Sequence, residues 1–214
     1  MNKLLVTMIA SAGLVASASA MAVTAKSAPY IGGEFGYGAP ALATDTYGTV
    51  NDATVGGVAG GGILGYNYAL TQNVLIGAEF GYHRDGKASF KNNDGSYLNI
   101  TSNDLDLLLT GTYLFNSGWN IFGKAGVARL MQSASEDNVA DNFSGSATLK
   151  KYKPDLKVGL GYLIDLQKAG SINIFAQYGH IFGNSEGSNT NPDPSKIPFA
   201  TNTITAGVTY NLPV

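Results

Sequence analysis

Hydrophobic and polar residues alternate with a period of two along most of the chain beyond residue 28. In the stretch VLIGAEFGYH, residues 74–83, the even positions carry apolar side chains, whereas Glu79 and His83 share the odd positions with glycines and a leucine. The stretches IGGEFGY, LKVGLGYLI and TITAGVTYNL divide in the same way. Because successive side chains of a β-strand point to opposite faces, this pattern predicts strands with one apolar face and one face of small and polar residues.

The alternation delimits eight strands, and the connections between them alternate in length. Glu34, Glu79 and Lys124 are evenly spaced along the chain, which indicates one up-and-down hairpin per interval. The predicted strands span residues 29–38, 55–68, 74–85, 103–115, 119–131, 155–166, 171–182 and 201–212. Tight turns (ALTQN, NSGWN and DLQKAGS) alternate with long polar loops predicted at 39–54, 86–102, 132–154 and 183–200. Short turns at one end and long loops at the other are typical of outer-membrane barrels.

The exterior distinguishes a membrane barrel from a soluble one. A soluble barrel keeps its apolar face inside and a charged face in water. Here only 13% of residues are charged, and the non-apolar face is mostly Gly, Thr, Asn and Ala, which is too bland for a water-exposed surface. Aromatic residues gather near both strand ends, as in the girdles of outer-membrane barrels. The sequence therefore predicts an all-β, eight-stranded antiparallel up-and-down transmembrane β-barrel. The predicted girdle residues are Phe35, Tyr37, Phe80, Tyr82, Tyr178, Phe182, Tyr66, Tyr68, Tyr113, Phe115, Trp119, Tyr162 and Tyr210.

The first residues, MNKLLVTMIASAGLVASASA, have the layout of a secretory signal peptide. Lys3 precedes a short apolar run, and small residues ending in Ala-Ser-Ala provide a cleavage site after Ala20. We expect a signal peptide at 1–20, a short lead at 21–28 and a barrel at 29–214. The absence of cysteine excludes a disulfide scaffold and a cysteine-ligated zinc site, and the net charge of −2 gives no basic footprint for nucleic acid.

These features together resemble a known family. The secretory leader, the opening strand YIGGEFGYG, the alternating long loops and tight turns, and the closing VTYNL are similar to the small OmpA/OmpX-like and opacity-protein-like outer-membrane barrels of Gram-negative bacteria. The resemblance implies location in the cell outer membrane, insertion by the barrel-assembly machinery, and contact with outer-membrane lipid and lipopolysaccharide as a monomer. The family's chains usually end on an aromatic residue, whereas Leu212 stands here, followed by Pro213 and Val214. No peptidoglycan-binding domain is expected after the barrel, so a full-length OmpA role is not implied.

The inward parity of the strands predicts a polar network in the lumen. We expect Glu79 to face a cation there, with Lys124 as its partner. Two acids and one base in the mid-depth layer lead us to expect a protonated glutamate or a further arginine to balance it. A side-chain-filled lumen and an ion path are both compatible with such a network. The mid-depth layer comprises Glu34, Glu79, Lys124 and Gln177, a higher layer comprises Asp106 and Lys157, and Asp104 and His83 are expected nearer the loops.

Catalytic and metal motifs are not evident. His83 is expected as a lumen histidine and His180 as a lipid-facing one. The run HIFGNSE places a serine and an acid after His180, but its spacing differs from the H-x-S-N pattern of lipid A deacylases. The NNDGS and NPDPS segments lack calcium-loop spacing and are better explained as turns. We therefore expect no enzyme activity, no cofactor and no metal.

Three functions remain open from the sequence. The leading hypothesis is a structural and surface-interaction protein that displays loops to a host or other extracellular ligand. A narrow pore or small-molecule uptake channel is the alternative, and a lipid A-modifying enzyme is the third. Lysine and arginine side chains near the loop ends could also bind the phosphates of lipopolysaccharide. These are Arg129, Lys150, Lys151 and Lys153.

Overall fold

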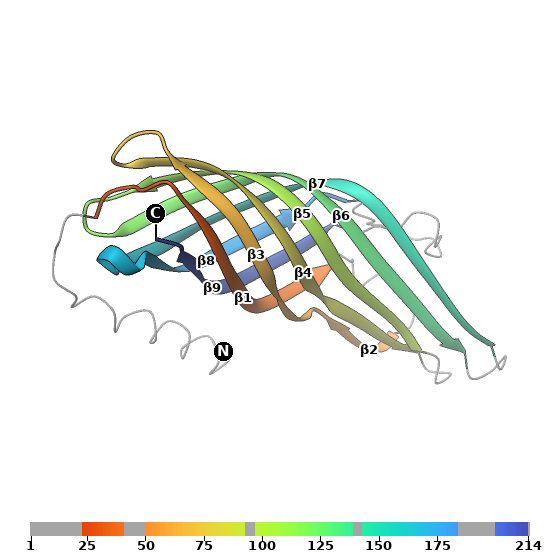
Figure 1. Cartoon of the computed structure of the whole chain (residues 1–214). Coiled ribbons are helices and arrows are strands. Elements are labelled where there is room, and N and C mark those ends of the chain that lie inside the picture. Colours follow the sequence, from red (N-terminus) through yellow and green to blue (C-terminus); the bar gives the residue numbers. More distant parts are fainter. Residues whose placement is uncertain (1–22, 41–49, 93–96, 139–142, 184–199, 214) are drawn as a thin grey trace.

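The computed structural model describes residues 23–40, 50–92, 97–138, 143–183 and 200–213, which form a closed antiparallel barrel (Figure 1). No helix in these ranges is long and apolar enough to cross a membrane. The strands are β1 (Ala28–Pro40), β2 (Val50–Val55), β3 (Gly57–Ala69), β4 (Val74–Asn92), β5 (Tyr97–Leu114), β6 (Trp119–Asn138), β7 (Phe143–Asp165), β8 (Ser171–Ile181) and β9 (Thr201–Asn211). A single 3-10 turn, η3 (Gln167–Ala169), joins β7 to β8.

The barrel closes between its first and last strands. β1 pairs antiparallel with β3 on one side and with β9 on the other, and every other barrel strand pairs with its neighbours along the chain. β2 continues the line of β3 and, among the described residues, pairs only with β4, so β2 and β3 together form one of eight strands around the barrel. This confirms the predicted eight-stranded up-and-down barrel. Closure gives the backbone groups along the barrel a partner in the neighbouring strand, which a structure in hydrocarbon requires.

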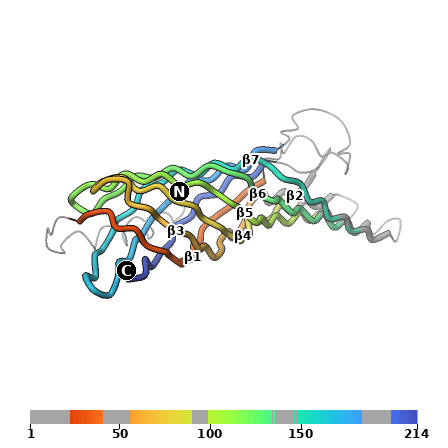
Figure 2. The backbone as a smooth tube through the Cα atoms, turned by 45° about the horizontal axis from the view of Figure 1, so that its top comes forward, coloured from red at the N-terminus to blue at the C-terminus, as the bar shows by residue number. Residues whose placement is uncertain are grey.

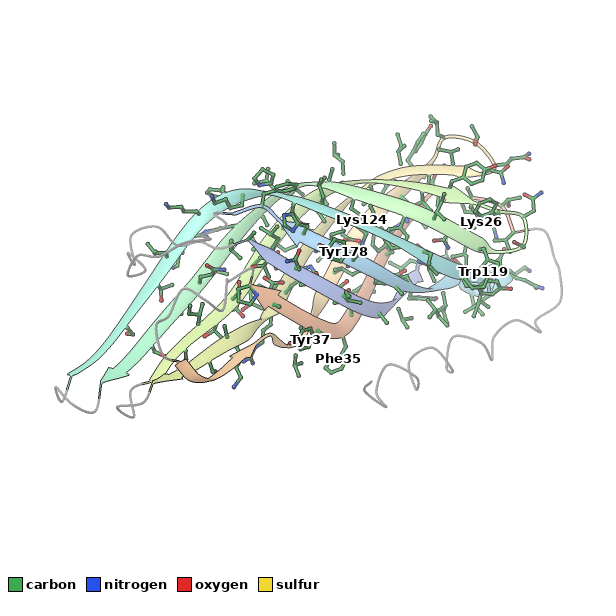
Figure 3. The ribbon with its side chains drawn as sticks, turned by 180° about the vertical axis from the view of Figure 1, so that it is seen from behind. Lys26, Phe35, Tyr37, Trp119, Lys124 and Tyr178 are labelled. Atoms are coloured by element: carbon green, nitrogen blue, oxygen red, sulfur yellow. The ribbon has the colours of Figure 1, made fainter. Side chains whose placement is uncertain are left out.

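Side chains alternate between the outside and the lumen. In β5, Leu107 and Leu109 are 63% and 74% exposed, whereas Leu108 between them is 1% exposed. The aromatic residues predicted as girdles are exposed, except Tyr162 and Tyr210, which are half-buried. Trp119 lies near the tight-turn end, whereas Phe35, Tyr37 and Tyr178 lie farther toward the opposite end (Figure 3). The outer surface is thus apolar along the barrel, as a lipid-facing surface must be.

The second predicted strand, 55–68, is not continuous, which corrects the sequence analysis. Gly56 has φ +107° and separates β2 from β3, and its amide donates to the carbonyl of Lys87 at 2.8 Å. Opposite it, the register of β4 and β5 shifts between Arg84 and Lys87, where Gly86 has φ +95°. Both glycines adopt backbone conformations that side chains disfavour. They mark the level beyond which β4 with β5, and β6 with β7, continue past the barrel body as two hairpins.

Segments 86–102 and 132–154 are mostly strand, and their prediction as long loops was wrong. β4 and β5 continue to Asn92 and from Tyr97, and β6 and β7 continue to Asn138 and from Phe143. The extended strands lie beyond the barrel body (Figures 1 and 2). Outside lipid a strand needs no apolar face, so the alternation that identified the strands disappears. Polar cross-strand contacts occur instead, for example Ser133 Oγ and Thr148 Oγ1 at 2.9 Å. The two remaining predicted loops lie mainly in residues 41–49 and 184–199, outside the described ranges.

The N-terminal lead packs across the tight-turn end. The amides of Val23 and Ala25 donate to the carbonyls of Asn116 and Gln72, two turn residues. Lys26 forms an ion pair of 2.8 Å with Asp165 at the end of β7. The lead therefore links the turn after β3, the turn after β5 and the end of β7. The predicted signal peptide at 1–20 lies outside the described residues.

Candidate functional site

A buried ion pair occupies the lumen in the half nearer the tight turns. Lys124 on β6 donates from Nζ to both oxygens of Glu79 on β4, at 2.7 and 2.9 Å, and the Tyr30 hydroxyl donates to Glu79 at 2.9 Å. The ammonium also lies over the rings of Phe122 and Phe175, 5.2 and 5.4 Å from their centroids. We call these five residues the Glu79 cluster. Each charge in it has a direct partner, as burial in a low-dielectric lumen demands.

The local sequence makes room for this cluster. Gly65 of β3 lies between Tyr30 and Glu79 in the strand register, paired with both. A Cβ at Gly65 would lie 2.5 Å from Tyr30 Cζ. A larger residue there would push the phenol ring away from the carboxylate. Gly65 is thus required because the side chain of Tyr30 passes directly over it.

A second and larger group of charges lies nearer the hairpin end. His83 on β4 has Nδ1 3.2 Å from Glu34 Oε1 and Nε2 3.3 Å from Asp106 Oδ2. Lys157 on β7 donates to Asp106 Oδ2 at 2.5 Å and lies 3.7 Å from Asp155 Oδ2. These residues form, with Asp104, Asp85 and Gln177, what we call the His83 cluster. Gln177 Nε2 donates to Glu34 Oε2 at 2.7 Å.

A glycine, Gly81, also makes room for the imidazole ring of His83. A Cβ at Gly81 would lie 2.2 Å from His83 Nε2 and 2.5 Å from Asp106 Oδ1. The imidazole therefore lies over its own strand and contacts Glu34 of β1 and Asp106 of β5. His83 is 3% exposed and Asp106 is 1% exposed. The cluster is closed off from bulk solvent by the wall that its own strands form.

A cavity of about 230 Å³ occupies the tight-turn half of the lumen. Glu79 and Lys124 contribute to its lining, together with hydroxyl and amide side chains such as Thr110 and Asn120. The lining also includes Lys26 and Asp165 near the tight-turn end. Space for small molecules or water thus reaches the Glu79 cluster from this half of the barrel.

The family model for the outer membrane protein beta-barrel domain matches residues 8–211. The chain belongs to this family. It is therefore an outer-membrane protein, and the geometry above is that of a lipid-embedded barrel with charged groups turned into its lumen. No curated protein sequence is significantly similar to the chain.

Several solved outer-membrane structures are similar to this family member at low identity. Ail, the attachment invasion locus protein of Yersinia pestis, is 14% identical, with a TM-score of 0.49 over 87% of this chain and 97% of its own. OprG of Pseudomonas aeruginosa is 16% identical, with a TM-score of 0.47 over 91% of this chain and 99% of its own. Neisserial surface protein A is 10% identical, with a TM-score of 0.42 over 88% of this chain and 100% of its own.

The single mid-depth layer expected from the sequence is instead two clusters. Glu34 contacts His83 and Gln177, whereas Glu79 contacts Lys124. The register explains the difference, because Glu34 lies across Gly61 from His83. Counting residues from each turn ignores the stagger of tilted strands in a closed barrel. A protonated glutamate or a further arginine was expected to balance the acids, and Glu34 instead contacts His83 and Gln177.

Sequence reasoning missed five lumen residues of these clusters. Asp85 and Asp155 have the inward parity of His83 and Lys157, so extending the alternation to the strand ends would have found them. Tyr30 shares the parity of Glu34 in the same way. Phe122 and Phe175 could not be found so directly, since an aromatic residue on the inward face departs from the small and polar pattern of that face.

The other histidine and the basic residues lie outside the lumen or at its rim. His180 Nδ1 is 2.7 Å from Asn202 Oδ1, and its ring meets Phe182 edge to face at 4.6 Å. Ser185 and Glu186, the remaining members of the HIFGNSE run, lie outside the described residues.

The basic residues selected from the sequence divide between two faces. Arg129 and Lys150 are exposed on the outer face. Lys151 and Lys153 have the inward parity of Asp155, which separates them from Arg129. Arg84 and Lys87 of β4, which the sequence analysis did not select, are exposed on the outer face.

The Glu79 cluster predicts a non-additive pair of substitutions. Glu79→Leu leaves Lys124 buried without its carboxylate, and breaking a buried pair typically costs about 3–5 kcal/mol of unfolding free energy. Adding Lys124→Leu should recover part of this loss, because the orphaned charge is removed. Urea unfolding in lipid vesicles measures both.

Ala78 provides the control on the neighbouring face. It is exposed on the outside of β4, so Ala78→Lys places a charge in lipid and should cost about 2–4 kcal/mol near the bilayer midplane. A stabilising Glu79→Leu, or a tolerated Ala78→Lys, would show that the two faces of β4 are assigned the wrong way round.

Proposed function

We propose that this outer-membrane barrel presents a binding surface for an extracellular partner. This surface is the sheet that β4, β5, β6 and β7 form beyond the barrel body, which we call the hairpin sheet. The supporting observation is a strand edge that has no partner among the described residues. β7 pairs with β6 from Phe143 to Tyr162, but with β8 only from Asp155 onward. The segment 143–153 therefore has a strand on one side only among the described residues.

Such an edge suits a polypeptide in extended conformation. The unpaired amides and carbonyls of an edge strand can accept another strand, and main-chain hydrogen bonds then supply affinity. The spatial order of the sheet beyond the barrel is β2-β4-β5-β6-β7, so β6, β5 and β4 follow one another behind β7. Ser146, Thr148 and Lys150 are exposed along the edge strand. A polar and exposed edge is well placed to bind a partner outside the membrane.

The lumen supports a structural role for the barrel body. The Glu79 and His83 clusters link β1, β4, β5, β6, β7 and β8 across the interior. An eight-stranded barrel is only wide enough for its side chains to fill it. The barrel then serves as an anchor that holds the hairpin sheet above the membrane.

A narrow channel is the second candidate, and one observation favours it. The cavity of about 230 Å³ extends from the tight-turn end of the lumen to the Glu79 cluster. A path through the barrel would also have to pass the His83 cluster, where Lys157, Asp106 and His83 are in contact. We therefore place conduction second.

Deleting residues 134–147 tests the proposed function. Ser133 and Thr148 face each other in the register, so a short Asn-Gly turn can join them without touching the barrel. Replacing only residues 139–142 by a glycine-serine turn is the matched control, because it leaves the β7 edge in place. Phage-displayed peptides selected on the wild-type barrel in nanodiscs supply the extended probe.

We expect peptide binding to be lost on deletion and kept in the control, and wild-type protein in planar bilayers to show no unitary conductance steps. The hairpins should also be cleaved by protease on intact cells. Peptides that bind the deletion variant equally well, or clear conductance steps from wild-type protein, would contradict the proposal.

We further propose that basic residues on the outer face bind lipopolysaccharide phosphates. Arg84, Lys87, Arg129 and Lys150 are exposed on β4, β6 and β7, beyond the aromatic residues of the same strands. Asn103 and Met131 lie between Arg84 and Lys150 in one cross-strand row. Lysine and arginine are suitable partners for phosphate at such a boundary. Of the residues first selected from the sequence, Arg129 and Lys150 fit this role better than Lys151 and Lys153.

Charge removal on this outer face tests the lipopolysaccharide proposal. Arg129→Gln with Lys150→Gln should abolish most of the rise in unfolding midpoint that lipopolysaccharide gives over phospholipid alone, at about 1 kcal/mol per charge. Lys168→Gln at the tight-turn end is the control and should keep the full rise. An equal rise in all three proteins would refute the assignment.

A further inference from the structure

The His83 cluster contains more buried acid than buried base. Five carboxylates face one lysine and one histidine there. The acids are Glu34, Asp85, Asp104, Asp106 and Asp155, and the bases are His83 and Lys157. Ionised carboxylates without partners are very costly in a low-dielectric interior. The cluster therefore needs either additional protons or an additional cation.

Three of these residues bring their donor atoms together. One ligand atom from each of His83, Asp104 and Asp106 lies within 4.8 Å of the other two. Their exposed fractions are 3%, 1% and 1%, so the atoms converge inside the barrel rather than on its surface. An imidazole nitrogen with two carboxylates is a donor set for divalent transition cations such as Mn²⁺ and Zn²⁺.

The hydrogen bonding of the same residues leaves carboxylate oxygens available, whereas His83 Nε2 lies 3.3 Å from Asp106 Oδ2 and 3.4 Å from Lys157 Nζ, contacts that a bound cation would replace. Neither oxygen of Asp104 accepts a hydrogen bond from the described residues, and Asp106 Oδ1 is likewise without a donor. Lys157 engages the other oxygen of Asp106, at 2.5 Å, so it does not use the one that remains. Asp155, 0% exposed, also has both oxygens without a hydrogen-bond donor among these residues. Buried carboxylate oxygens are normally satisfied.

The contact between His83 and Glu34 suits a metal ligand. Nδ1 of His83 lies 3.2 Å from Glu34 Oε1, an ion-pair contact in which no hydrogen bond is formed in this structure. In many metal sites a carboxylate accepts the N–H of the ligating histidine, which fixes the tautomer and turns the other nitrogen to the metal. Glu34, itself held by Gln177, would orient His83 in this way and present Nε2 toward the aspartates.

We propose that the barrel lumen holds a divalent transition cation bound by His83 Nε2, Asp104 and Asp106, with Glu34 orienting the histidine. Asp85 and Asp155 lie around this set and add negative charge that favours a divalent ion over a monovalent one. The mixed nitrogen and oxygen donors favour Mn²⁺ or Zn²⁺ over Ca²⁺, which takes oxygen ligands. The site is independent of the hairpin edge and of the outer basic residues.

Metal retention after refolding tests the site. The protein is refolded in detergent with Mn²⁺, Zn²⁺ or Ca²⁺, dialysed, and analysed for bound metal and for the Mn²⁺ electron paramagnetic resonance spectrum. Asp104→Asn removes one ligand charge with little change of shape. Asp165→Asn makes the same change at the tight-turn end, outside the cluster, and is the matched control. The shift in gel mobility on boiling verifies that each variant is folded.

We expect the wild type and Asp165→Asn to retain about one Mn²⁺ or Zn²⁺ per chain, and Asp104→Asn to bind at least about tenfold more weakly. His83→Gln should weaken Zn²⁺ binding similarly, which gives a second readout if Asp104→Asn does not fold. Absence of retained metal in the wild type would overturn the proposal and indicate that shared protons neutralise the carboxylates. Equal retention by Asp104→Asn and Asp165→Asn, or retention of Ca²⁺ as strong as that of Zn²⁺, would also overturn it.

Discussion

Backbone hydrogen bonding in a medium without water is the constraint on which this structure depends. Every amide and carbonyl within the bilayer needs a partner in the protein, and a closed ring of antiparallel strands provides it. The pairing of β1 with β9 completes that ring. Once it is closed, each strand has one face in lipid and one in the lumen, so apolar residues such as Leu109 lie outside and Glu79 must lie inside.

Charges that the ring turns inward must then be balanced within a narrow interior. The Glu79 cluster does this with one lysine, one tyrosine hydroxyl and two aromatic rings. The His83 cluster joins strands from opposite sides of the barrel but contains more carboxylates than cationic side chains. This excess of carboxylates is the basis of the proposed cation site. Glycines such as Gly65 and Gly81 are part of the same solution, because they give the large side chains room to cross neighbouring backbone.

The sequence predicted the barrel well because the alternation is strict wherever strands cross lipid. The inward parity of Glu79 and Lys124 follows from it directly, and the structure places the two side chains 2.7 Å apart. The strand ends beyond the barrel body were not predicted. There the strands need no apolar face, and polar residues such as Ser133 and Thr148 interrupt the alternation. The division of the lumen into two clusters was also missed, because the stagger between strands that brings Glu34 to His83 is a property of closure and leaves no local signal.

Accessibility along β5 tests the assignment of faces most directly. The chain has no cysteine, so single spin labels at positions 107, 108 and 109 can be introduced without background and exposed to oxygen, which enriches in lipid, or to a water-soluble nickel chelate. This account predicts high oxygen accessibility at Leu107 and Leu109 and low accessibility to both reagents at Leu108. Greater oxygen accessibility at Leu108 than at its neighbours, or equal values at all three positions, would contradict a lipid-embedded barrel with a packed lumen.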